Sequence, residues 1–252
     1  MSERRPRLAP LVMVDSADSL KAPTFDFMLL VVSAIAAALA SIEPTTNPAS
    51  VADAALDPAV VFAVSLYLAM RASSGLASLA SSGLLQLYLS YPLGRVGVAL
   101  ALYLSRILLP VLVLVGAPLV VAAAIVPHVI AGAPLAYLEA YGAYVVYLTF
   151  LGTLFGLVGV ASKNSGTSAV AGLAIYFLYE GVYLLLNVMA TARGSYTLHK
   201  IAMAMTFYSV VSLKLSSPGV AVSAWQLLFV PGLLVALFIV YLAYMRWRFE
   251  PP

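Results

Sequence analysis

The chain has 252 residues, of which 63% are hydrophobic and only 9% are charged, with a formal net charge of +3. Soluble globular proteins carry about 25% charged residues, so this composition excludes a soluble domain of any size. It predicts an all-α polytopic membrane protein. The basic residues are scattered, which does not favour nucleic-acid binding, and the absence of cysteine excludes disulfides and cysteine-bound metals.

The first 24 residues are polar and contain three prolines. Their charged stretch is too long and too mixed for a secretory signal. We predict a cytoplasmic N-terminal tail over residues 1–24, with an interfacial helix over Leu8–Leu20.

Six apolar stretches follow that are long enough to cross a bilayer, which requires about 20 residues. The predicted spans, within a transmembrane domain over 25–245, are residues 25–42, 58–79, 96–126, 134–161, 167–190 and 224–245. Pro58 suits the first turn of the second span. Pro110 and Pro118 predict a kink in the third. Residues 246–252 form a short C-terminal tail.

The distribution of Lys and Arg in the short loops predicts the orientation. Basic residues lie in the N-terminal tail, the 71–95 region, the loop at Lys163 and the C-terminal tail. In the 43–57 and 127–139 loops, by contrast, the Asp, Glu, Lys and Arg positions are all acidic. We therefore expect a multi-pass protein of the cell membrane with both termini in the cytoplasm.

One segment departs from this rule, because the predicted external stretch 191–223 carries Arg193, Lys200 and Lys214. It also contains weakly helical sequence over 196–215. We interpret this part as a re-entrant or interfacial element, since such backbone is tolerated where protein buries it.

The loop between the second and third spans reads Ser81-Ser82-Gly83-Leu84-Leu85-Gln86-Leu87-Tyr88-Leu89-Ser90-Tyr91-Pro92-Leu93-Gly94-Arg95. Its leucines and Tyr88 recur at helical spacing, and Pro92 ends the helix. A short amphipathic helix on the cytoplasmic face can serve as a docking ridge for a soluble partner. It can equally be a plain interfacial loop-helix.

This loop resembles the segment reading E-R-G-T-L-E-x-L-L-x-x-P-x-S-R in permease subunits of ABC-2 type ABC transporters. The matching positions are Gly83, Leu84 or Leu85, Gln86, Leu89, Pro92 and Arg95. The six-span layout and the re-entrant-looking segment are also similar. In place of the family's acidic residues the chain has Ala80, Ser81, Ser82 and Gln86.

The resemblance implies a coupling helix that inserts into a cleft of an ABC ATP-binding subunit. It also implies a second permease copy or a paralogue, contact with membrane lipids, and ATP-driven export. Ionic contacts with the ATPase would then use other residues, such as Arg71 or Arg95.

No phosphate-binding sequence G-x-x-x-x-G-K-[ST] occurs in the chain. We therefore expect a transport subunit rather than an enzyme, with no cofactor of its own and with ATP and Mg²⁺ bound by the partner. The two histidines, His128 and His199, are not arranged as a metal site.

Glu180 lies in the middle of the fifth predicted span, where a carboxyl group requires a partner. It is either a substrate-path or proton-relay group or one end of a helix–helix hydrogen bond to tyrosine, and Arg106 is a candidate partner. One face of the fourth span carries a row of tyrosines that either lines a substrate path or packs at the membrane interface: Tyr137, Tyr141, Tyr144 and Tyr147.

Two other classes of function compete with the permease. The chain would be a structural or assembly subunit of a membrane complex if the amphipathic helix only docks a partner. It would be an ion-coupled secondary transporter if Glu180 is its coupling group.

Overall fold

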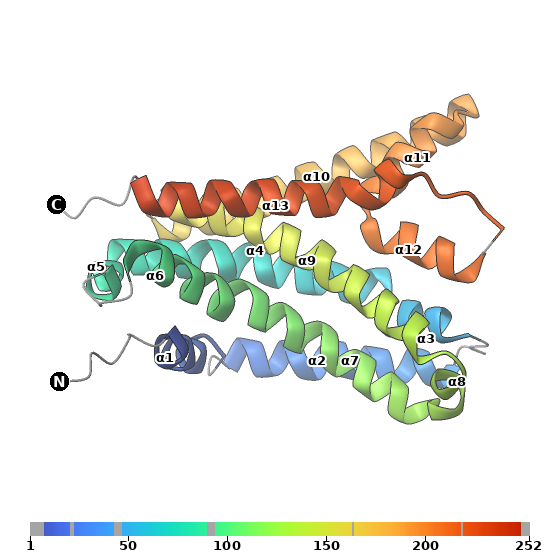
Figure 1. Ribbon diagram of the computed structural model, residues 1–252, viewed down its shortest axis with the longest axis horizontal. Helices are drawn as coiled ribbons and strands as arrows, with labels where there is room; N and C mark the ends of the chain where they lie inside the picture. The colour runs from blue at the N-terminus through green and yellow to red at the C-terminus, as the bar shows by residue number, and fades with distance from the viewer. Residues whose placement is uncertain are drawn as a thin grey trace.

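The computed structural model describes residues 8–20, 23–42, 47–89, 94–162, 164–217 and 219–247, and these ranges contain helices and no strand (Figure 1). The helices in chain order are α1 (Leu8–Leu20), α2 (Pro23–Ile42), α3 (Pro48–Ala55), α4 (Pro58–Ser81), α5 (Leu84–Leu89), α6 (Gly94–Tyr103), the π-helical turn η1 (Leu104–Leu108), α7 (Leu109–Ile125), α8 (Pro127–Gly132), α9 (Pro134–Ser162), α10 (Ser165–Arg193), α11 (Tyr196–Met205), α12 (Phe207–Ser216) and α13 (Ala224–Trp247).

Six helical units within the described ranges are long and apolar enough to cross a membrane. They are α2, α4, the continuous unit α6–η1–α7, α9, α10 and α13. The predicted all-α polytopic membrane protein with six transmembrane helices is therefore confirmed.

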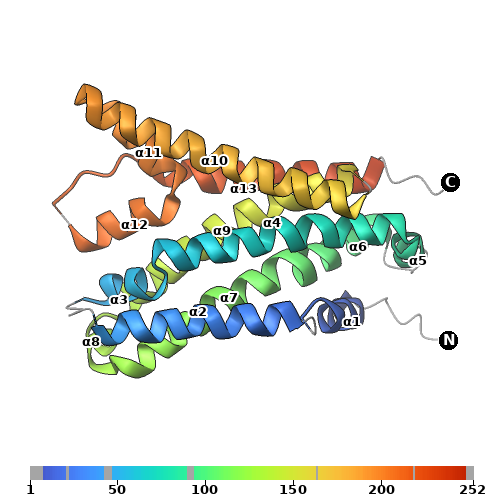
Figure 2. The same cartoon turned by 180° about the vertical axis from the view of Figure 1, so that it is seen from behind.

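The six spans lie side by side, and the short helices gather at the two ends of the bundle (Figures 1 and 2). Helices α1 and α5 lie at the end where α13 finishes, which we call the α5 end. Helices α3, α8, α11 and α12 lie at the other end, the α8 end. Helix α1 runs across the bundle and is seen end-on in Figure 1.

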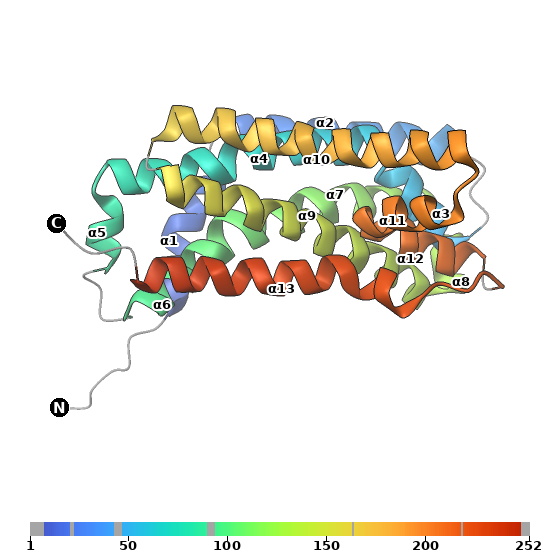
Figure 3. The same ribbon diagram turned by 90° about the horizontal axis from the view of Figure 1, so that it is seen from above.

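The spans differ in how much of their surface is buried. The most apolar stretches of α4 and α9 are 50% and 61% buried, against 11% for those of α10 and α13. Figure 3 shows α10 and α13 on opposite sides of α9. Helices α4 and α9 therefore form the interior, and α10 and α13 present apolar outer faces.

Small residues allow the central helices to approach closely. A Cβ atom added at Gly172 of α10 would lie 2.5 Å from the backbone oxygen of Ala69 on α4, and one at Gly159 of α9 would collide with the Ser73 carbonyl on α4. At Gly152 and Gly156 it would meet the Ile107 side chain at 2.8 Å. The Gly152–Gly156 G-x-x-x-G pair thus serves packing within the chain.

The third span contains a π-helical turn. In η1 the backbone N–H of Leu109 bonds to the carbonyl of Leu104, five residues earlier. Pro110 follows directly, and proline neither donates to nor fits against the carbonyl four residues before it. The wider turn accommodates this proline. The kink predicted from Pro110 and Pro118 stays a prediction.

Two glycines delimit the loop that contains α5. Gly83 and Gly94 have φ angles of 75° and 68°, in the left-handed region that favours glycine. Gly83 lies between α4 and α5, and Gly94 begins α6. They allow the chain to turn sharply before α5 and again at the start of the third span.

The segment predicted as re-entrant or interfacial, 196–215, forms two short helices, α11 and α12, at the α8 end. Helix α11 packs on α10 and α13, whereas α12 packs on α9, α13 and α3. Thr206, between the two helices, is 2% exposed. Both helices therefore lie against the bundle rather than apart from it.

The close approach of α10 to α4 can be tested with two glycines of one helix. Gly172→Ala places a methyl group against the Ala69 backbone, and we expect a loss of about 1–3 kcal/mol in stability from overpacking. Gly181→Ala meets nothing within 4 Å and should leave the thermal unfolding temperature in detergent unchanged or slightly raised. Equal unfolding temperatures for the two variants would contradict the packing described here.

Candidate functional sites

An ion pair joins α1 to the π-helical turn of the third span. Asp15 of α1 is 0% exposed, and its carboxylate accepts from Arg106 Nη2 at 2.7 Å and from Nε at 3.0 Å. The Ser105 hydroxyl donates to the same carboxylate. Such a pair offsets the cost of burying two charges only when its geometry is good and other hydrogen bonds satisfy the remaining atoms, as they do here.

The same two side chains connect two further helices. Nη1 of Arg106 donates to the carbonyl of Gly75 on α4 at 3.0 Å. The hydroxyl of Tyr88 on α5 donates to Asp15 at 3.5 Å. One buried pair therefore links α1, α4, α5 and the third span.

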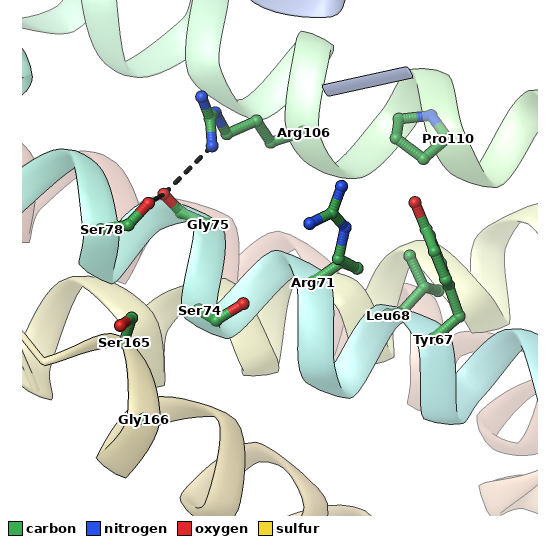
Figure 4. A pocket seen from close by; sticks show the side chains of 10 residues that line it. All are labelled: Tyr67, Leu68, Arg71, Ser74, Gly75, Ser78, Arg106, Pro110, Ser165 and Gly166. Carbon is green, nitrogen blue, oxygen red and sulfur yellow. Dashed lines mark hydrogen bonds between the residues drawn. The ribbon is translucent and has the colours of Figure 1, made fainter. Parts of the chain in front are cut away.

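A partly open cavity of about 430 Å³ has Arg106 in its wall. Figure 4 shows Arg71 and Arg106 converging on this cavity from α4 and the third span. Ser74 and Ser78 of α4 and Ser165 at the start of α10 also line it. The cavity is thus polar, cationic and lined by three spans.

Sequence reasoning assigned Asp15 to a polar tail and gave it no role. The hydrophobic residues of α1 give little sign of which face is buried, and no local pattern connects Asp15 with a residue 91 positions later. The only available signal was a lone arginine inside an apolar span, which requires a carboxylate partner.

Glu180 is half-buried and accepts a hydrogen bond from the Tyr147 hydroxyl at 3.3 Å. The candidate pairing with Arg106 is not formed, because Arg106 binds Asp15. Tyr147 itself is 0% exposed and packs edge-on against Tyr208 of α12. The contact is the helix–helix hydrogen bond to tyrosine that the sequence offered as one interpretation.

The other tyrosines of the row on α9 form hydrogen bonds with other helices. Tyr137 and Tyr141 donate to backbone carbonyls of α7, at 2.5 Å and 3.5 Å. Tyr144 donates to Asp53 of α3 at 3.0 Å, and Ser212 of α12 donates to the same carboxylate. Of the four tyrosines, Tyr147 is the one that hydrogen-bonds to Glu180. The other three form hydrogen bonds that join α9 to α7 and α3.

The predicted docking residues separate into two faces of α5. Leu85 is 2% exposed and anchors α5 to the bundle, whereas Leu84 is 46% exposed and Gln86 is exposed. Gly83 precedes the helix and Leu89 is its last residue, while Pro92 lies outside the described residues.

Arg95, at the start of the third span, donates to the carbonyl of Arg246 at 3.0 Å. This bond ties the α5 loop to the last turn of α13. Arg95 therefore joins the third span to α13 at the α5 end by a hydrogen bond.

No protein-family model matches the chain, and a search of curated proteins finds no match.

The buried Asp15–Arg106 ion pair predicts that changing Asp15 alone lowers the stability of the protein strongly. Asp15→Asn leaves the Arg106 guanidinium without its counter-charge, and we expect the loss of about 3–5 kcal/mol that follows when one partner of a buried pair is removed. Asp26→Asn makes the same change at an exposed acid near the start of α2 and should cost less than about 0.5 kcal/mol. Thermal unfolding of the two purified variants checks this, and similar unfolding temperatures would show that the pair contributes little.

Proposed function

We propose that the chain is the membrane-spanning subunit of an ATP-driven exporter of the ABC-2 type. The observation that carries the proposal is α5, a short helix fixed to the bundle by one face and open on the other. It occupies the loop whose sequence resembles the family's coupling segment.

The anchoring of α5 suits a helix that transmits force. Leu85 fixes it to the bundle, and the positive-φ residues Gly83 and Gly94 set the direction in which it leaves α4 and enters α6. Leu84 and Gln86 remain available to a partner. A helix mounted in this way moves with the spans to which it is joined.

A chain of polar contacts leads from α5 into the bundle. Tyr88 of α5 contacts Asp15, Asp15 pairs with Arg106, and Arg106 bonds to Gly75 of α4. Displacement of α5 by an ATPase subunit would thus act on α1, the second span and the third span together. This linkage is the mechanical property that a coupling helix requires.

The partners follow from this proposal. An ABC ATP-binding subunit, which would bind ATP and Mg²⁺, docks on α5 from the cytoplasm. A second copy or a paralogue completes the path in the cell membrane. In this orientation both termini are cytoplasmic, and α11 and α12 lie on the outer side.

A secondary transporter that uses Glu180 is the second candidate, because Glu180 is a carboxyl group within a span whose hydrogen-bond partner is a tyrosine hydroxyl rather than a basic side chain. It would need no nucleotide and would lose ion coupling on Glu180→Gln. A permease driven through α5 should transport with this variant as long as the Tyr147 hydrogen bond is retained.

The docking role of α5 can be tested with Leu84→Glu. A buried charge at the interface should lower the recovery of an ATP-binding chain co-purified with the full-length protein by about tenfold or more, and the ATPase activity of the complex with it. Leu135→Glu introduces the same charge at an exposed leucine of α9 at the α8 end and should have no effect.

Mass spectrometry of the purified complex identifies the partner by its phosphate-binding sequence. Recovery of the same ATPase at wild-type levels with Leu84→Glu would refute docking on α5. Purification of the active protein without any ATP-binding chain would refute the proposed function as a whole.

A further inference from the structure

The cavity beside Arg106 has the composition of an anion site. Arg71 and Arg106 project into it from two spans, and the hydroxyls of Ser74 and Ser165 lie on its wall (Figure 4). Its volume of about 430 Å³ falls within the range of small-molecule sites, about 300–1,000 Å³. A cavity of this size that presents two guanidinium groups suits an anion with several oxygen atoms.

The charges around the cavity do not cancel. Asp15 neutralises Arg106, but Arg71 forms no ion pair with any carboxylate among the described residues. Asp26, which interacts electrostatically with Tyr67 on the cavity wall, is itself exposed. The cavity therefore has an excess positive charge, which an anion would balance.

Backbone groups at the start of α10 add to this preference. Ser165 and Gly166 line the cavity and form the first turn of a 29-residue helix. The first N–H groups of a helix have no acceptor within it, and they carry partial positive charge. The Asn164 side chain caps only the N–H of Thr167, at 3.1 Å.

Part of the cavity wall lies beside the starts of two spans, α2 and α10. Tyr67 on its wall packs against Phe25, in the first turn of α2, with ring centroids 6.0 Å apart. Arg106 bonds to α1, the helix that runs across the bundle at the α5 end. The start of a span marks the level of lipid headgroups, where the commonest anion is phosphate.

We propose that this cavity binds a phosphate group, held chiefly by Arg71, and that an anionic phospholipid headgroup supplies it. Guanidinium groups bind phosphate through paired, charge-assisted hydrogen bonds. Basic pockets between transmembrane helices are known to hold lipid headgroups. The proposal does not depend on which partner drives the protein.

The test compares two arginine variants of the full-length protein in detergent. Native mass spectrometry measures the affinity for dioleoyl phosphatidic acid, with dioleoyl phosphatidylcholine as the zwitterionic reference. Arg71→Gln should weaken phosphatidic acid binding by about tenfold, the effect of one lost charge-assisted contact. Arg246→Gln, which removes an exposed charge at the same end of the bundle, should bind as wild type.

A parallel measurement with inorganic phosphate distinguishes the source of the group. If millimolar phosphate displaces the lipid, and does so less well with Arg71→Gln, a soluble phosphate compound can also fill the site. If phosphate fails to displace the lipid, the headgroup and its acyl chains are both required. Either result supports a phosphate site at Arg71.

Two results would overturn the proposal. One is equal retention of phosphatidic acid and phosphatidylcholine by the wild-type protein, which needs no variant to fold. The other is an equal loss of phosphatidic acid binding with Arg71→Gln and Arg246→Gln, since the attraction would then be general to the basic surface.

Discussion

The buried pair between Asp15 and Arg106 is the interaction on which the arrangement at the α5 end depends. An arginine inside an apolar span is costly unless a carboxylate reaches it, and here that carboxylate comes from α1, outside the six spans. The wide turn before Pro110 carries both Ser105 and Arg106, whose side chains bind the same acid. The pair thus ties α1 across the bundle and holds Arg106 in the wall of the polar cavity.

Away from this pair, close packing of small residues holds the bundle together. In a membrane the apolar outer faces of α10 and α13 gain little from mutual burial, because lipid is equally apolar. Contact between backbones, as at Gly159 and Gly172, then supplies the attraction through dispersion. Tyrosine hydrogen bonds from α9 to its neighbours add direction to this packing. The interior is therefore closely packed, while α5 and the outer helices carry exposed surfaces.

The sequence predicted the six spans and the helix of the α5 loop because apolar length and helical spacing are local properties. It also predicted a helix over Leu8–Leu20. The Asp15–Arg106 pair could not be predicted, because its two residues are far apart in the chain and a charged residue in a tail is ordinarily solvated. The two faces of α5 could not be assigned for a similar reason: two adjacent leucines, Leu84 and Leu85, are equivalent by composition, and only packing buries the second.

We propose that α5 faces the compartment that holds ATP, with α11 and α12 on the other side of the membrane. The chain contains no cysteine, so single cysteines report position without further changes. Labelling intact cells with a membrane-impermeant maleimide should modify a cysteine at exposed Tyr196 of α11 and leave one at exposed Gln86 of α5 unmodified until the membrane is permeabilised. Labelling of Gln86→Cys from outside, with Tyr196→Cys protected, would contradict the account.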